Sequence, residues 1–165
     1  MVESEKKSVY IETTIPSYAT AKPSENIIVA GKQAATRLFW EQGQHEYDFV
    51  TGEEVLKECQ LGDAEAAERR KTFLIGIPVL PKTQGIIELA DVYQSLLKIP
   101  EKAKLDCLHL ATCVVARVDY LLTWNCAHLG HITYSKMRTY NDKHGLWTPF
   151  LVTPEDLIGR MEESL

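Results

Sequence analysis

The fold of this chain is decided by two neighbouring stretches, LDCLHLA at residues 105–111 and YLLTWN at residues 120–125. The first predicts a helix that is apolar almost all round and carries one carboxylate, Asp106. The second predicts a buried strand whose end carries a hydroxyl, Thr123, and an amide, Asn125. Because a carboxylate in an apolar element is costly without a partner, we expect Asp106 to face a cation, a donor or a metal.

On both sides of these two stretches, strand and helix patterns alternate along the chain. We expect a loop after the first strand, because Pro16 and Pro23 interrupt it, and a helix at 26–42 that buries a stripe of apolar residues. The stripe comprises Ile27, Ala30, Ala34, Leu38 and Phe39. The expected strands are 9–11, 47–51, 77–80, 120–124 and 150–152. The other expected helices are 53–60, 64–74 (capped by Asp63), one from Thr83 to before Pro100, one from Asp106 to about Val118, and one that begins at Thr153-Pro154.

Apolar strands separated by helices imply a mostly parallel sheet that is covered on both faces. We therefore predict a three-layer α/β/α sandwich. The length of 165 residues fits one domain over 1–165, with a core at about 8–155 and a C-terminal helix to 165.

Composition indicates the cellular compartment of the protein and limits the kinds of partner it can bind. The formal net charge of −5 argues against a protein that coats nucleic acid through bulk positive charge, although carboxylates that bind metal also count as negative. The four cysteines, Cys59, Cys107, Cys113 and Cys126, show no paired spacing, which favours free thiols in a reducing compartment. With neither a signal peptide nor an apolar run long enough to span a membrane, we predict a cytoplasmic protein with no membrane partner.

Oxygen-bearing side chains follow the strands. Glu12, Thr13 and Thr14 come directly after the first strand, and Thr123 and Asn125 follow the fourth. Since ligands of such folds gather at the carboxyl ends of the strands, these residues predict a site for a hard divalent cation.

Other kinds of site fit less well. The nucleotide-binding glycine motifs and the nucleophile elbow are absent. Cys126-x-His128-x-x-His131 has thiolate and imidazole groups that suit zinc but lacks an evident fourth ligand. A haloacid-dehalogenase-type phosphatase is a second enzyme class, but it needs a nucleophilic Asp with an acid two residues on, and Glu12-Thr13-Thr14 offers neither.

Taken in order, Glu12 at a strand end, Glu58 with Gly62 four residues on, Asp106-x-x-His-x-Ala and Thr123-x-Asn125 resemble the PIN-domain family, and within it the VapC-type toxins of type II toxin–antitoxin pairs. The resemblance covers residues 8–155. It implies a metal-dependent endoribonuclease that uses Mg²⁺ or Mn²⁺, acts on RNA, forms a homodimer and is neutralised by a small cognate antitoxin.

The resemblance also implies roles for individual residues. Asp106 and Glu12 would be the principal metal ligands, Glu58 a ligand or a base that orients water, and Asn125 a direct or water-mediated ligand. Thr13 and Thr123 would orient the carboxylates through hydrogen bonds. The family usually has Asp where this chain has Glu12, and commonly an acid where it has Asn125. The alternative is therefore a catalytically weakened PIN-fold module that binds RNA or protein.

Simpler interpretations remain open for several residues. Asp106 could be an acid in the first turn of a helix, where the helix dipole favours negative charge. Glu12 could cap the turn after the first strand, and Glu58 could be a solvated surface charge. His109 fits a hydrogen-bonded core histidine better than a ligand. The basic run at 69–71, Arg-Arg-Lys, fits a solvated helix face or an RNA contact.

Overall fold

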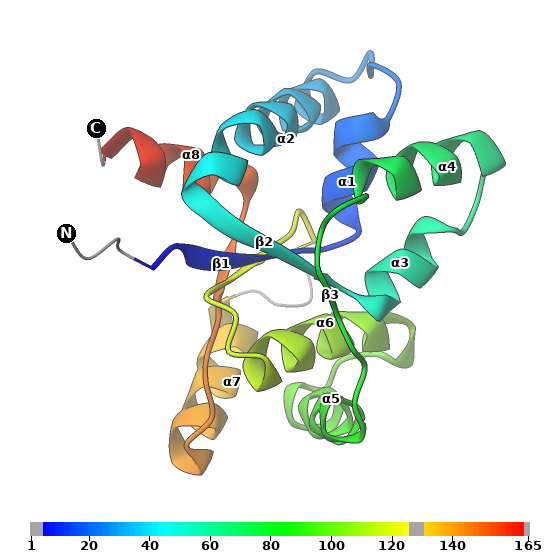
Figure 1. Cartoon of the computed structure of the whole chain (residues 1–165). Coiled ribbons are helices and arrows are strands. Elements are labelled where there is room, and N and C mark those ends of the chain that lie inside the picture. The colour runs from blue at the N-terminus through cyan, green and yellow to red at the C-terminus, as the bar shows by residue number, and fades with distance from the viewer. Residues whose placement is uncertain (1–4, 126–130, 164–165) are drawn as a thin grey trace.

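A five-stranded sheet with the strand order β3-β2-β1-β4-β5 forms the centre of the molecule (Figure 1). The computed structural model describes residues 5–125 and 131–163. The strands are β1 (Lys7–Ile11), β2 (Tyr47–Gly52), β3 (Val79–Leu80), β4 (Tyr120–Leu122) and β5 (Phe150–Val152). All four strand pairings are parallel, which confirms the predicted sheet.

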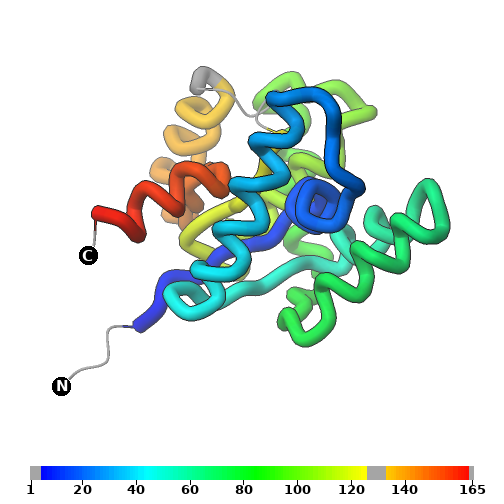
Figure 2. Tube along the Cα trace, turned by 90° about the horizontal axis from the view of Figure 1, so that it is seen from above, coloured from blue at the N-terminus to red at the C-terminus, as the bar shows by residue number. Residues whose placement is uncertain are grey.

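Helices cover both faces of the sheet. The helices are α1 (Thr14–Thr20), α2 (Ile27–Glu46), α3 (Glu53–Cys59), α4 (Ala64–Phe73), α5 (Gln84–Leu97), α6 (Lys104–Val115), α7 (His131–His144) and α8 (Pro154–Glu163), with a 3₁₀ turn η1 at Glu101–Ala103. Seen from above, α8, α2, α1 and α4 follow one another on one face (Figure 2). Helices α5, α6 and α7 cover the other face, and α3 lies at the carboxyl edge (Figure 1). The predicted α/β/α sandwich is confirmed.

The apolar helix predicted at residues 105–111 lies in the core. Every residue of α6 from Cys107 to Val114 is buried, because the helix packs between the sheet and α5. On the sheet side, Val9, Tyr10 and Ile11 of β1 are fully buried. A helix that is covered on two sides needs apolar residues around most of its circumference, which is the pattern that the sequence shows.

The predicted helix starts have the expected capping bonds. Asp63 accepts a hydrogen bond from the Ala66 amide, and Thr83 accepts one from the Ile86 amide. At α8, the Thr153 hydroxyl accepts from the Asp156 amide while the Asp156 carboxylate accepts from Thr153, a reciprocal cap.

The loop predicted after the first strand is wrong, because residues 14–20 form α1. Pro16 is buried at the third position of this helix. A proline in the first turn removes an N–H that has no partner within the helix, so it does not prevent the helix.

Of the apolar stripe predicted for α2, Phe39 is buried as expected, but the rest of the stripe is wrong. Ile27 is 85% exposed and Leu38 is 42% exposed, while the buried positions are Gln33, Thr36, Phe39 and Gly43. The buried polar groups have partners: Gln33 binds the backbone of residues 22 and 24, and Thr36 binds Trp124. Hydropathy alone misplaces such a face, because satisfied polar groups can be buried at low cost.

Other differences concern where the helices and strands begin and end, and one helix that the sequence did not predict. Helix α2 continues to Glu46, β3 begins only at Val79, β4 ends at Leu122, and α7 was not predicted. Helix α7 is mostly polar, with Met137 and Asn141 as its buried positions among the described side chains. Among residues 5–125 and 131–163, no helix has the length and apolar character that crossing a bilayer requires.

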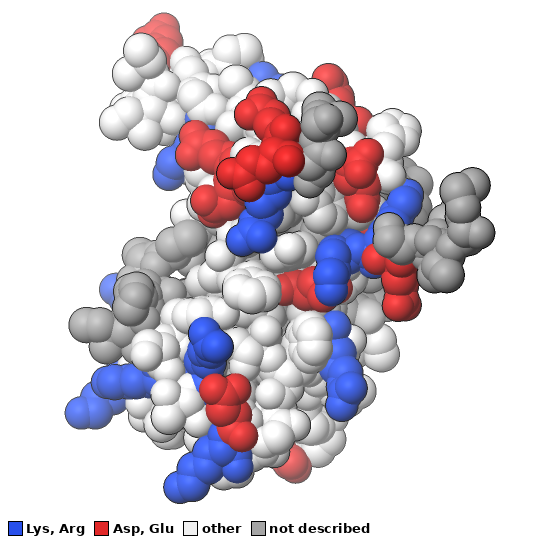
Figure 3. Space-filling view, turned by 90° about the vertical axis from the view of Figure 1, so that its left-hand side faces the viewer, with Lys and Arg blue, Asp and Glu red and all other residues white. Residues whose placement is uncertain are grey.

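Charge is unevenly distributed over the face that carries α7 and α8 (Figure 3). Acidic side chains gather in the upper part around α8, and basic side chains lie mainly in the lower part around α7. Helix α8 carries Glu155, Asp156, Glu162 and Glu163, whereas α7 carries Lys136, Arg138 and Lys143. The net charge of −5 therefore does not describe every surface.

Candidate metal centre at the carboxyl edge of the sheet

The sheet reverses its connection order between β1 and β4, which are neighbours in the middle of the sheet. Glu12 directly follows β1, and Thr123 directly follows β4. The Glu12 amide donates to the Leu122 carbonyl at 3.2 Å, and the Thr123 hydroxyl donates to Glu12 Oε2 at 2.8 Å. In open parallel sheets, such a switch point is where ligands bind.

Glu12 is only 6% exposed. Its Oε2 accepts hydrogen bonds from the Thr14 amide at 3.0 Å and the Thr14 hydroxyl at 2.5 Å, as well as from Thr123. Within the described part of the chain, no Lys or Arg forms an ion pair with this carboxylate. Glu12 is thus held by neutral donors, and a cation would compensate its charge.

Glu58 of α3 faces the same space, with 21% of its side chain exposed. Its Oε2 accepts from the Thr13 hydroxyl at 2.6 Å and from His109 Nε2 at 2.8 Å. Burial raises the pKa of the Glu58 carboxyl. The hydrogen bonds from His109 and Thr13, together with the charge of His109, outweigh burial and hold the pKa below its ordinary value.

His109 is 2% exposed, and both of its ring nitrogens are engaged. Nδ1 lies 2.9 Å from the Tyr10 hydroxyl and Nε2 faces Glu58. Burial lowers the pKa of His109, but the Glu58 hydrogen bond and the charges of Glu12, Glu58 and Asp106 raise it by more, so the pKa lies above its usual value. Whether the ring is neutral or charged, a proton on Nε2 satisfies Glu58. The expectation of a hydrogen-bonded core histidine is met.

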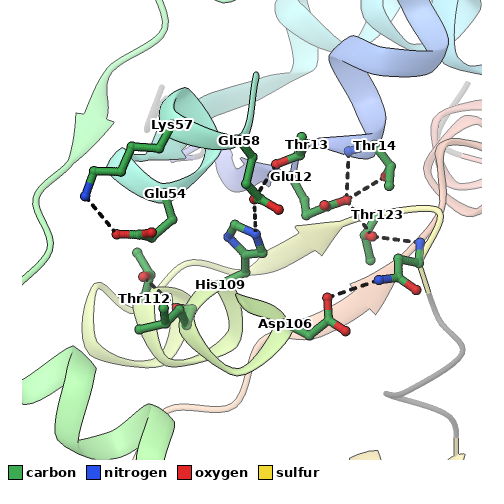
Figure 4. A network of polar contacts seen from close by, with 12 residues as sticks. Glu12, Thr13, Thr14, Glu54, Lys57, Glu58, Asp106, His109, Thr112 and Thr123 are labelled. Carbon is green, nitrogen blue, oxygen red and sulfur yellow. Dashed lines mark hydrogen bonds and ion pairs between the residues drawn. The ribbon is translucent and has the colours of Figure 1, made fainter. Parts of the chain in front are cut away.

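One ligand atom each from Glu12, Glu58 and His109 lie within 4.8 Å of one another (Figure 4). Because His109 Nε2 carries the proton shared with Glu58, the histidine acts on the carboxylate and not as a ligand itself. The hydrogen bonds described above end on Oε2 of each glutamate, which leaves each Oε1 for a further ligand. Two carboxylate oxygens are donors that fit Mg²⁺ or Mn²⁺.

Asp106 and Asn125 lie beside this pair and contact each other. Asn125 Nδ2 donates to Asp106 Oδ1 at 3.0 Å, and the Asn125 amide donates to the Thr123 hydroxyl at 2.9 Å. The structure therefore brings Glu12 and Glu58 into one group, and places Asp106 with Asn125 in a second group that Thr123 joins to Glu12 (Figure 4). The side-chain nitrogen Nδ2 of Asn125 faces Asp106, so the side-chain oxygen Oδ1 of Asn125 is the atom that suits a cation.

Sequence reasoning missed the groups that surround these carboxylates. Glu54, one turn before Glu58, accepts from Lys57 at 3.2 Å and from Lys82 at 2.9 Å. Burial raises the pKa of Glu54, but the two lysines lower it by more. The i, i+4 spacing of Glu54 and Glu58 could have indicated a shared helix face, whereas no local pattern indicates Lys82 or Tyr10.

The basic run at 69–71 has mainly structural contacts. Arg70 donates to the carbonyls of Cys59 and Leu61, and Arg69 donates to the Thr20 carbonyl and to Glu65. Lys71 lies 3.8 Å from Glu68 and is 65% exposed. Arg70 is therefore neither fully solvated nor free to contact RNA, because its side chain bonds α4 to the end of α3.

The cysteine and histidine trio that the sequence offers as a less suitable zinc site falls mainly outside the described residues. Cys126 and His128 lie outside the described residues, and the side chain of His131 is not described. The zinc alternative, which the lack of an evident fourth ligand disfavours, is therefore not tested. Cys59, Cys107 and Cys113 are free and buried, as expected.

The chain is thus a parallel α/β/α sandwich with acidic residues at its switch point. No protein-family model and no curated protein matches this chain. Among solved structures, one chain of the crystal structure of VapBC2 from Rickettsia felis bound to a DNA fragment from their promoter is similar, with a TM-score of 0.59 and 15% sequence identity. The similarity covers 88% of this chain and 98% of that chain. The resemblance to the PIN-domain family is therefore confirmed for the fold.

Proposed function

We propose that this chain is a metal-dependent endoribonuclease, the VapC-type toxin of a toxin–antitoxin pair. The observation that carries the proposal is the pair Glu12 and Glu58 at the switch point of a PIN-like fold. Their Oε2 atoms are fixed by hydroxyl, amide and imidazole donors, while their Oε1 atoms remain for a cation. The substrate would be single-stranded or structured RNA.

Glu12 and Glu58 would hold Mg²⁺ or Mn²⁺, with Asp106 and the Asn125 carbonyl oxygen completing the site. When bound, the ion would stabilise negative charge on the phosphate and activate water. Thr14 and Thr123 keep Glu12 from rotating, and Thr13 and His109 do the same for Glu58. Because its pKa is lowered, Glu58 is ionised at neutral pH and suited to accept a hydrogen bond from the attacking water.

The partners follow from the same chemistry. Among the described residues, no Lys or Arg forms an ion pair with Glu12 or Glu58. The acidic site would therefore accept an Arg or Lys from a short antitoxin, since charge-assisted bonds to carboxylates are strong. The similar structure carries the name of a VapBC2 assembly on promoter DNA. We further propose a homodimer that acts in the cytoplasm, in keeping with three free, buried cysteines.

A catalytically weakened binding module is the second candidate. The observation that favours it is the Asn125–Asp106 hydrogen bond, which uses the Asp106 carboxylate for an internal contact and adds no charge at the end of β4. Such a module would bind RNA or a protein without cleaving either.

The test is cleavage of single-stranded RNA by the purified chain in Mg²⁺, in Mn²⁺ and in EDTA. Glu12→Gln and Glu58→Gln should each abolish cation-dependent cleavage. Asp119→Asn is the matched control, because Asp119 is also a hydrogen-bonded acid but lies at the amino edge of the sheet beside Ser8. Intact RNA with the wild type at every cation concentration would reject the nuclease in favour of the binding module.

Metal binding is tested separately by thermal melting. A cation that binds only the folded state raises its stability by about 2.7 kcal/mol at a hundred times its Kd. Mn²⁺ should therefore raise the Tm of the wild type and of Asp119→Asn but not that of Glu58→Gln. An equal rise in all three proteins would place the cation elsewhere.

A further inference from the structure

Three side chains from separate elements meet beside the carboxylates. They are Tyr18 of α1, Lys32 of α2 and Trp124, which follows Thr123. The ring centroids of Tyr18 and Trp124 are 6.0 Å apart with the planes tilted by 46°. Lys32 Nζ lies 5.9 Å from the Tyr18 centroid and 5.2 Å from the Trp124 centroid. All three side chains are partly exposed, so the group reaches the surface.

Trp124 is hydrogen-bonded to Thr14, one of the residues that hold Glu12. Its backbone N–H donates at 2.9 Å to the Thr14 hydroxyl, which itself donates to Glu12. Its indole Nε1–H donates at 2.9 Å to the buried Thr36 hydroxyl. With its polar atom satisfied by Thr36, the indole offers an apolar ring surface, and Thr14 links the backbone of Trp124 to Glu12.

Two arginines contact the end of α1. Arg37 donates to the carbonyls of Ala19 and Ala21, and Arg69 donates to the Thr20 carbonyl. Helices α1 and α2 lie side by side here (Figure 2). Lys32 and Arg37 of α2 therefore place two cations beside α1, whereas Arg69 also pairs with Glu65 at 2.9 Å.

We propose that Tyr18, Trp124 and Lys32 form a subsite that stacks a nucleobase of single-stranded RNA beside the acidic site, next to the phosphate that a cation on Glu12 and Glu58 would bind. The inference rests on the proposed function and names a substrate contact for it. Aromatic rings stack bases of any sequence, and a cation beside them pairs with the phosphate backbone. Lys32 would leave the ring face to contact a phosphate as the base takes its place.

A role in packing alone is the competing explanation. Packing would explain the Tyr18–Trp124 contact, but it predicts no difference between a nucleic acid with bases and one without. The two explanations therefore separate in a binding experiment that needs neither metal nor cleavage.

The experiment measures fluorescence anisotropy of a labelled 2′-O-methyl oligonucleotide and of its abasic counterpart, with the full chain in EDTA. Tyr18→Leu and Trp124→Leu should each weaken binding of the base-containing probe by between about fivefold and a hundredfold and leave the abasic probe unchanged. Trp124→Phe should restore most of the affinity. Lys32→Gln should weaken both probes and reduce the salt slope by about one.

Trp147→Leu is the control, because Trp147 is also partly exposed but donates to Val118 at the amino end of β4. Melting temperatures confirm that each variant is folded. For Tyr18→Leu and Trp124→Leu, equal losses for both probes, or no loss, would overturn the subsite even if the wild type cleaves RNA. Ring-dependent binding without any cleavage would reject the nuclease and keep the subsite.

Discussion

His109 Nε2 lies 2.8 Å from Glu58 Oε2, and the opposite ring nitrogen lies 2.9 Å from the Tyr10 hydroxyl. A buried histidine of α6 therefore connects the middle of β1 to a carboxylate on α3. This connection fixes which oxygen of Glu58 remains for a cation, although His109 itself is not available as a ligand.

Replacing His109 by Leu should lower both stability and metal affinity. The change leaves the Tyr10 hydroxyl without its buried partner and frees Glu58 to rotate, at a cost of about 1–3 kcal/mol in the free energy of unfolding. Urea denaturation measures the first effect and titration calorimetry with Mn²⁺ the second. A variant that loses stability but binds Mn²⁺ as tightly as the wild type would show that His109 does not position Glu58.

Asn125→Asp should increase the affinity or stoichiometry of Mn²⁺ binding, because it adds a negative charge at the end of β4. The same change should destabilise the metal-free protein, since the amide that donates to Asp106 is replaced by a second carboxylate. Calorimetry and melting in EDTA test the two effects. An unchanged Mn²⁺ titration would mean that Asn125 does not reach the ion.

Asp119 should contribute stability that depends on pH. Burial raises the pKa of Asp119, but hydrogen bonds from Ser8 and Lys7 lower it by more, so the folded-state pKa lies below the ordinary value of 3.8. Its contribution is therefore complete above 3.8 and is lost as the pH falls through the lower folded-state value. Asp119→Asn should cost about 1–2 kcal/mol at neutral pH. The gap between the urea midpoints of the two proteins should narrow below pH 3.8, and a constant gap would contradict the assignment.

Gly52→Ala should destabilise the protein through Tyr10. A Cβ at Gly52 would collide with the Tyr10 hydroxyl, although the backbone angles at Gly52, φ −118° and ψ 160°, suit any residue. We expect a loss of about 1–3 kcal/mol. In the Tyr10→Phe background the same substitution should cost less, because the colliding oxygen is gone. A double-mutant cycle measures the coupling, and additive losses would refute it.

The sequence predicted the parts of the site that depend on strand ends. Glu12 and Thr123 follow apolar strands, and parallel strands end at the same edge, so their meeting could be expected. Glu58 was reached only through the family resemblance, because nothing in helix 53–60 distinguishes it from Glu54. The contact between Tyr10 and His109 spans 99 residues, and hydropathy cannot reveal that two buried polar groups satisfy each other. The same limit explains the wrong face assigned to α2.

The hydrogen bond from Thr123 to Glu12 joins residues that are 111 positions apart. Strand β4 pairs with β1 only after β2, β3 and the helices between them have been made, and β5 follows β4. During synthesis, the carboxylate of Glu12 therefore lacks its neighbours from β4 until most of the polypeptide has left the ribosome. The site can therefore assemble only late in synthesis, when the end of β4 has reached Glu12.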